Sequence, residues 1–169
     1  LLAPDLIQTG SCWQLCADAN GYARSDGESL TTQACRGRRF RILEKQRKRI
    51  AVQLLEDGYR CWLELEAVLG RAEQCSPWRP SPLSASEIEQ RLPGVLAWSE
   101  TAQQRPNIYL WGGSTEPDMD CSGLMQMAFA NTRWLATTEL NSAAQAVWCV
   151  AMTDRISPEA VSPINRAPA

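Results

Sequence analysis

The alternation of apolar and polar residues predicts several short β-strands near the start of the chain. Apolar residues occupy every second position in residues 38–44 and again in residues 49–55, so each segment can bury one face. A third segment rich in aromatic and branched residues, 59–65, follows the turn signal Asp57-Gly58. Short strands joined by tight turns are typical of a small antiparallel barrel, which we expect over residues 9–70.

A different pattern follows this unit. Residues 71–85 hold three prolines and no regular periodicity, which is typical of a linker between domains. Beyond it, Ser86 is a good N-cap for a helix with apolar residues on one face, which Pro93-Gly94 should kink or interrupt. A second apolar run, starting at about Asp120, predicts another helix. The fold class expected from this order is α+β, with the second domain over residues 86–169.

Composition narrows the class of protein. The chain has 169 residues, 44% of them hydrophobic, which suits one ordinary domain or two small ones. Its formal net charge of -2 gives no general attraction to nucleic acid or to an anionic membrane, and we expect neither as a partner. No apolar stretch approaches the roughly 18 residues that span a bilayer, and no secretory signal opens the chain, so we expect a cytoplasmic location.

One local patch departs from this balance. The run from Arg36 to Arg49 holds eight Lys or Arg residues in fourteen. It could bind nucleic acid or a wall polymer, or it could be the solvated side and turn of a hairpin. We favour the solvated hairpin, because no aromatic stacking residues are interleaved along the run.

The cysteines do not indicate a metal site. There are seven, an odd number, without metal-ligand spacing, and the chain has no histidine. We therefore expect no metal and no cofactor, and we expect most of these cysteines to be small buried hydrophobic residues.

One cysteine has a more suggestive setting, in the stretch YLWGGSTEPDMDCSGLMQMAFA, residues 109–130. A cysteine is a nucleophile as the thiolate, and the first turn of a helix stabilises an anion there. Cys121 would lie in that turn, with Asp120 as the helix cap. Upstream, Gly112-Gly113 allows close approach of the backbone or a ligand, and Tyr109 and Trp111 would share one strand face. Asp-Cys-Ser-Gly alone favours a buried cysteine, whereas the complete spacing favours a nucleophile.

The order Tyr-x-Trp-Gly-Gly, then Asp-Cys-Ser-Gly seven residues later, resembles the NlpC-type cell-wall cysteine peptidases, which have a papain-like fold. The segments LCADANGYARSDGESLTTQACRGRRFRIL and IAVQLLEDGYRCWLELEAV resemble the bacterial SH3-like domain that precedes the catalytic domain in cyanobacterial members. The resemblance implies hydrolysis of γ-D-glutamyl-diamino acid bonds in peptidoglycan stem peptides with a free N-terminal L-Ala. It implies that Cys121 is the nucleophile and that Tyr109 helps to stabilise the oxyanion. Asp120, Ser122 and, in the barrel, Tyr59 would bind near the substrate amine.

The resemblance weakens after Ala130. The family continues with Trp-Leu-Pro-Arg-Asp, a Gly-Asp-Leu turn and a histidine base, of which this chain keeps only Trp134-Leu135. Its 46 residues from Leu124 contain no glycine, and residues 138–152 have helical spacing. Either the reading frame changes near codon 131, which we favour, or the protein is a shortened relative. In both cases we expect no turnover, with a non-catalytic muropeptide- or protein-binding module as the alternative function.

Overall fold

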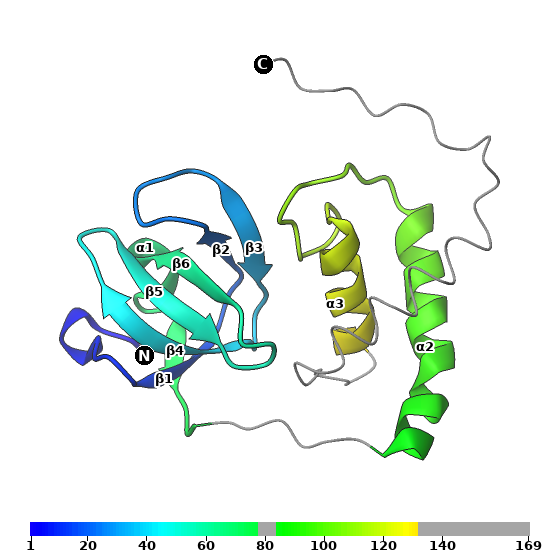
Figure 1. The fold of residues 1–169 in the computed structure, drawn as a ribbon, viewed down its shortest axis with the longest axis horizontal. Helices are drawn as coiled ribbons and strands as arrows, with labels where there is room; N and C mark the ends of the chain where they lie inside the picture. Colours follow the sequence, from blue (N-terminus) through cyan, green and yellow to red (C-terminus); the bar gives the residue numbers. More distant parts are fainter. Residues whose placement is uncertain (78–83, 132–169) are drawn as a thin grey trace.

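The computed structural model describes residues 1–77 and 84–131. Its first part is one antiparallel sheet of seven strands, which curls into a half-barrel (Figure 1). In chain order the elements of this part are η1 (Pro4–Leu6), β1 (Cys12–Leu15), β2 (Ala19–Tyr22), β3 (Leu30–Ala34), β4 (Arg39–Lys45), β5 (Arg49–Leu54), β6 (Arg60–Glu64), α1 (Leu65–Val68) and β7 (Ala72–Gln74).

The strands lie in the order β3-β2-β6-β5-β4-β1-β7, so β3 and β7 are the two edges. The three predicted strands, two from alternation and one from its aromatic and branched residues, are confirmed as β4, β5 and β6, and they pair in two successive hairpins. The turn between β4 and β5 closes with a hydrogen bond of 2.8 Å from the Gln46 N–H to the Arg49 carbonyl. The sheet also reaches into the predicted linker, because β7 pairs with β1.

The barrel core is built from the alternating apolar positions of these strands. Phe40 and Ile42 of β4 face Val52 and Leu54 of β5, and all four residues are buried. Trp13 and Leu15 from β1 and Leu63 from β6 complete the same cluster, which Leu2 joins from outside the predicted domain bounds. The predicted alternation is therefore correct, and the N-terminal residues also belong to this core.

The expectation of a fully solvated basic hairpin is wrong for two of its arginines. Arg38 and Arg49 are each only 8% exposed. Arg38 forms an ion pair of 2.6 Å with Asp57, and Arg49 donates to two backbone carbonyls, contacts Glu64 and lies 3.8 Å from the centre of the Tyr22 ring. A guanidinium carries five N–H donors, so it can enter a protein interior when acceptors surround it.

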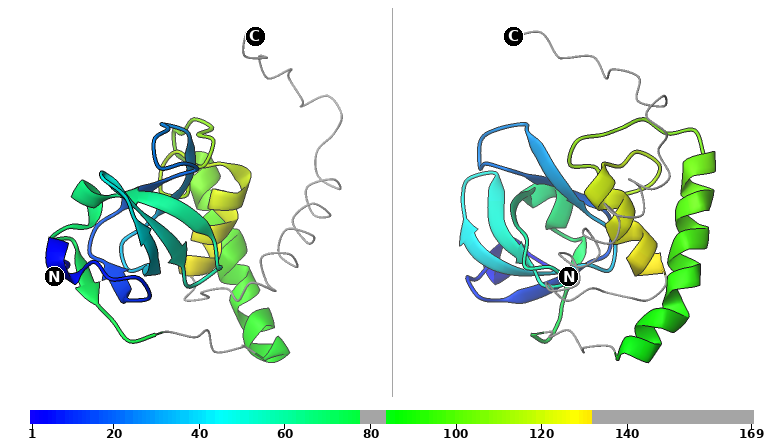
Figure 2. Two further views of the ribbon diagram at one scale, coloured as in Figure 1. Left: turned by 60° about the vertical axis from the view of Figure 1, so that its left-hand side comes forward. Right: turned by 45° about the vertical axis from the view of Figure 1, so that its right-hand side comes forward.

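Two helices make up the rest of the described chain, α2 (Ala85–Gln104) and α3 (Cys121–Asn131). Helix α3 lies between the barrel and α2, as Figure 1 and the right-hand view of Figure 2 show. Val95 of α2 and Ala128 of α3 form the buried contact between the two helices. Strands and helices thus combine as the α+β expectation requires, and no described helix is long and apolar enough to cross a membrane.

The predicted cap of α2 is wrong, and of the two effects predicted for Pro93-Gly94, a kink or an interruption, the interruption does not occur. The helix cap is Ser84 rather than Ser86, and Ser84 forms a reciprocal capping box with Glu87. Pro93 lies inside the helix without ending it. Both Pro93 and the Glu89 residue whose carbonyl it leaves without a donor are exposed, so water can supply the missing hydrogen bond.

Candidate active site

The first turn of α3 is held by the carboxylate of Asp120. One oxygen, Oδ1, accepts hydrogen bonds from the Gly123 N–H at 2.7 Å and from the Ser122 hydroxyl at 2.7 Å. The other, Oδ2, accepts from the Gly112 N–H at 2.9 Å. Asp120 is therefore the helix cap that the sequence predicts, and it also ties the helix to the glycine pair upstream.

The glycines at this point allow two backbones to touch. Gly112 has a φ of +75°, a conformation that favours glycine. The Gly113 carbonyl accepts a hydrogen bond of 3.0 Å from the Asp120 N–H, and a Cβ placed on Gly123 would fall on that same carbonyl oxygen. The segment from Gly113 to Asp120 therefore forms a loop whose two ends are in direct backbone contact.

Cys121 is the first residue of α3 and is exposed. Its thiol therefore lies where the unpaired N–H groups and the dipole of the helix favour an anion. Of the other described cysteines, Cys61 is buried, and desolvation raises its pKa to about 12. Burial also raises the pKa of Cys35 and Cys75. Among the cysteines in the described ranges, Cys121 is the one that a reagent or substrate can reach freely.

Tyr109 is near enough to this thiol to interact with its charge. Desolvation and then the charges of Cys121 and Asp120 raise the pKa of its phenol, although the residue stays 62% exposed. The strand expected through Tyr109 and Trp111 is reduced to an isolated bridge between Tyr109 and Met119, and Trp111 is 71% exposed. Both rings therefore point to solvent in the described part of the chain.

The barrel brings Tyr59 towards the same turn. The Tyr59 hydroxyl lies 2.7 Å from the Thr31 hydroxyl at the edge strand β3. The backbone of Leu30 and Thr31 lies against Gly112, where an added Cβ would be 2.9 Å from the Leu30 oxygen. Tyr59, which is 42% exposed, is thus separated from the glycine pair by one residue of β3.

A second set of contacts joins β3 to the turn, and sequence reasoning did not find it. Gln33 accepts hydrogen bonds from the Ser114 N–H at 3.0 Å and from the Thr115 hydroxyl at 2.8 Å. These partners lie 81 and 82 positions apart in the chain, and no local pattern marks a glutamine for such a contact. Helix α3 touches the barrel as well, through a hydrogen bond of 3.2 Å from Arg38 to Gln126.

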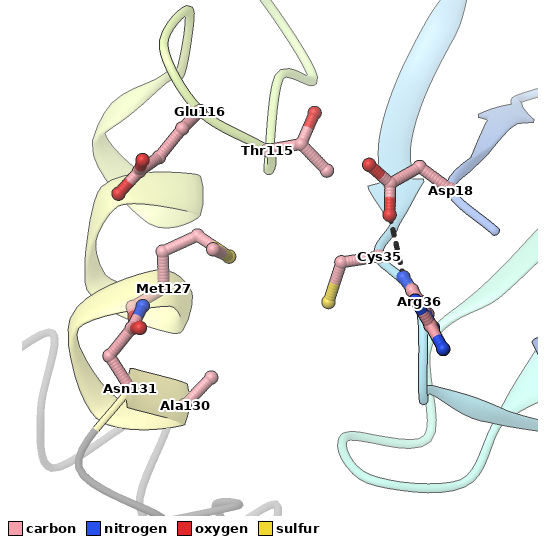
Figure 3. Close-up of a pocket in the computed structure, with 8 residues that line it drawn as sticks. All are labelled: Asp18, Cys35, Arg36, Thr115, Glu116, Met127, Ala130 and Asn131. Carbon is pink, nitrogen blue, oxygen red and sulfur yellow. Dashed lines mark hydrogen bonds between the residues drawn. The ribbon is translucent and has the colours of Figure 1, made fainter. Parts of the chain in front are cut away.

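A cleft of about 380 Å³ separates the barrel from α3 (Figure 3). Its walls are Asp18, Cys35 and Arg36 on the barrel side, and Thr115, Glu116, Met127, Ala130 and Asn131 on the other. Asp18 accepts a hydrogen bond of 2.6 Å from the Arg36 N–H. Cys121 does not line this cleft, so we assign the cleft no part in the thiol chemistry.

No group of three or more potential metal ligands occurs within residues 1–77 and 84–131. The candidate site therefore consists of a thiol, a phenol, a capping carboxylate and backbone N–H groups. Such a set can attack an acyl carbon and stabilise the resulting oxyanion, which is the chemistry of thiol hydrolases.

Comparison with known proteins agrees with this geometry. A family model described as the bacterial dipeptidyl-peptidase Sh3 domain matches residues 21–68, and the NlpC/P60 family model matches residues 106–160. Residues 106–160 thus resemble the NlpC/P60 family, and residues 21–68 resemble a bacterial SH3-like domain, as expected from the sequence. The NlpC/P60-type family suggests a peptidoglycan-hydrolysing cysteine peptidase that acts on cell-wall peptides.

Two solved structures are similar to this chain. NlpC2 from Trichomonas vaginalis is 14% identical, with a TM-score of 0.35, over 76% of this chain and 68% of that chain. NlpC1 from the same organism is 14% identical, with a TM-score of 0.40, over 80% of this chain and 69% of that chain. No curated protein matches the sequence.

The matched range bears on where the resemblance ends. We expected the match to fail after Ala130, but the NlpC/P60 range continues to residue 160. The predicted helix over residues 138–152 lies outside the described residues, as does Cys149. The chain of 169 residues nevertheless contains no histidine, the residue type that the resemblance implies as the base.

Proposed function

We propose that this chain binds peptidoglycan stem peptides of the type L-Ala-γ-D-Glu-diamino acid at the Cys121 turn, and that the 169-residue polypeptide does not hydrolyse them measurably. The observation that carries the proposal is the exposed Cys121 on a helix start that Asp120 and the glycine pair hold closed. Free peptides of the cytoplasm, rather than the intact wall, are the substrates that fit the location expected from the sequence.

The reaction of the family type would begin with the Cys121 thiolate. The sulfur attacks the γ-D-glutamyl carbonyl carbon, the amine of the diamino acid leaves with a proton, and water then hydrolyses the thioester. Tyr109, whose phenol lies near Cys121, is our candidate for stabilising the oxyanion, together with N–H groups of the α3 turn. Each step needs a group that accepts and then returns a proton.

That group is what the chain lacks. A general acid or base contributes about 10² to 10⁴ in rate, whereas a helix dipole contributes about 0.3 to 1 kcal/mol and does not accept a proton. Asp120 does not replace a histidine, because a carboxylate is a much weaker base than an imidazole near pH 7. We therefore expect binding without turnover.

Substrate binding needs a partner for the free amine. A carboxylate offers about four lone-pair positions, and three of those of Asp120 are occupied, two on Oδ1 and one on Oδ2. The remaining position on Oδ2 can accept one N–H of an ammonium group. Ser122 orients the carboxylate through its hydroxyl, and Tyr59 is the candidate contact from the barrel side.

Calorimetry and mass spectrometry test these statements separately. We expect saturable binding of L-Ala-γ-D-Glu-diamino acid and no new product after long incubation. The Cys121→Ala variant should bind similarly, whereas Asp120→Ala should bind more weakly, because it loses both the cap and the ammonium partner. Product that disappears in Cys121→Ala would overturn the inactivity proposal, and the absence of saturable binding would overturn the binding proposal.

The alternative function, a module that binds a muropeptide or protein through the barrel, rests on the β4–β5 turn. This turn exposes Lys45, Arg47 and Lys48. The neighbouring Arg38 and Arg49 are instead buried in the barrel. If a triple substitution of the exposed residues with Ser abolishes binding while Asp120→Ala does not, the barrel module is the better description.

Two origins of residues 131–169 remain open to test. The match through residue 160 supports a divergent domain, whereas the missing histidine and glycines support a change of reading frame. Translation of the other two DNA frames downstream of codon 131 distinguishes them. Segments reading Trp-Leu-Pro-Arg-Asp and Gly-Asp-Leu, followed by a histidine, would appear only after a frame change.

A further inference from the structure

The edge strand β3 of the barrel is in direct contact with the turn that precedes the thiol. Gln33 is the centre of this contact. The side-chain oxygen of Gln33, Oε1, accepts hydrogen bonds from the Ser114 N–H and from the Thr115 hydroxyl. The backbone N–H of Gln33 donates to the Ser114 hydroxyl at 3.5 Å. Thr32 adds a contact of 3.4 Å to that hydroxyl, and Ser114 is buried.

Gly113 and Asp120 connect this contact to the helical turn that carries Cys121. Ser114 follows Gly113, whose carbonyl accepts the Asp120 N–H and lies against Gly123 of the first helical turn. Gly112 in turn donates to the Asp120 carboxylate and lies against the backbone of β3. The turn 112–115 is therefore fixed on one side by the barrel and on the other by the helix start.

We propose that Gln33 is a positioning residue for the candidate thiol site, because it fixes the turn 112–115 against which the start of α3 is built. The proposal rests on the proposed function in so far as peptide binding is its readout. It also assigns the barrel a specific part in the site, since a barrel residue determines where the Cys121 turn lies.

The chemistry of the side chain makes the proposal specific. Gln33 uses its oxygen as a double acceptor towards the turn, while its Nε2 donates to Asn20 Oδ1 at 3.0 Å. Alanine loses the acceptor and the donor together. Glutamate keeps the acceptor towards the turn, and rotation of the Asn20 amide presents its NH₂ group to the second oxygen. Gln33→Glu should therefore retain the positioning that Gln33→Ala loses.

Amide hydrogen exchange of residues 110–120 measures the positioning without any ligand. For Gln33→Ala we expect exchange of this segment to accelerate about 5- to 150-fold, the range for losing two neutral hydrogen bonds. Gln33→Glu should stay within about threefold of the unmodified chain. Asn20→Ala is the matched control, because it removes the far partner of Gln33 and leaves both bonds to the turn.

Peptide affinity and alkylation of Cys121 by iodoacetamide, as a function of pH, provide the second readout. Gln33→Ala should weaken binding and change the alkylation profile, and Gln33→Glu should restore both. If Gln33→Ala does not fold, Thr115→Val removes one of the two bonds from the turn side and should show a smaller change in the same direction.

The outcomes separate this proposal from the proposed function. Faster exchange and altered alkylation with no peptide binding in any variant would support the role of Gln33 and reject the proposed ligand. Exchange and alkylation in Gln33→Ala and Thr115→Val that match the unmodified chain would overturn the positioning role, even if the peptide binds.

Discussion

Substituting Gly123 with alanine tests the closed turn that precedes Cys121. The new Cβ would fall on the Gly113 carbonyl oxygen and lie 2.8 Å from Ser114 Cα. These neighbours are backbone atoms, and the Gly113 oxygen already accepts the Asp120 N–H, so neither side can move without breaking a hydrogen bond. We expect the helix start to shift away from the turn.

The magnitude follows from three terms. Overpacking costs about 1 to 3 kcal/mol, and loss of the Asp120 cap costs about 0.5 to 2 kcal/mol. Alanine gains about 1 kcal/mol of helix propensity over glycine, which offsets part of this loss. The net expectation is that the free energy of unfolding falls by about 0.5 to 4 kcal/mol.

Urea unfolding followed by circular dichroism measures this difference, with Gly94→Ala as the matched control. Gly94 is an exposed residue within α2, so the same substitution there should raise stability by up to about 1 kcal/mol. Opposite signs at the two positions support the close approach. If Gly123→Ala is as stable as Gly94→Ala, the contact between Gly113 and Gly123 does not exist as described.

Three further predictions concern the barrel and the cysteines. Arg38→Met leaves Glu56 and Asp57 without their buried cation, so urea unfolding should show a loss of about 3 to 5 kcal/mol, and a neutral result would contradict the buried ion pairs. Desolvation raises the pKa of Glu56 above its ordinary value of 4.5, so the folded state binds that proton more tightly. The resulting stability is complete below pH 4.5 and is lost as the pH rises through the raised pKa; Glu56→Gln should remove this component of a stability-against-pH profile, and an unchanged profile would count against it. Iodoacetamide at pH 8 should modify Cys121 first and leave Cys61 unmodified until the chain unfolds, because Cys61 is buried and its pKa is about 12; mass spectrometry of digested samples that shows early Cys61 labelling would refute this.

Much of the barrel could be predicted because its information is local. Strands β4 and β5 alternate apolar and polar residues, β6 is rich in aromatic and branched residues after the Asp57-Gly58 turn, and tight turns connect the three strands. A period of two places one face inward whatever the partner strand is, so the pattern alone identifies the strands. The burial of Arg38 and Arg49 could not be predicted from this local pattern, because their hydrogen-bond acceptors come from other segments of the chain.

The start of α2 shows why local rules can leave two answers. Both Ser84 with Glu87 and Ser86 with Glu89 have the Ser-x-x-Glu spacing of a capping box. The structure uses the first pair, in which the Glu87 carboxylate also accepts from the Ser84 hydroxyl. The two choices differ by less than one helical turn, which is too small a difference for periodicity to resolve.

Local sequence was sufficient to predict the front of the candidate site. Asp120 caps a helix three residues ahead of Gly123, and the glycine pair lies seven and eight positions before it, so short-range bonds are sufficient to build the setting of Cys121. The contact of Gln33 with this turn is visible in the tertiary structure alone, whereas Tyr59 was already a candidate through the family resemblance. Their contacts depend on how the edge of a sheet meets a distant turn, and that geometry follows from the packing of the whole fold, which no local periodicity records.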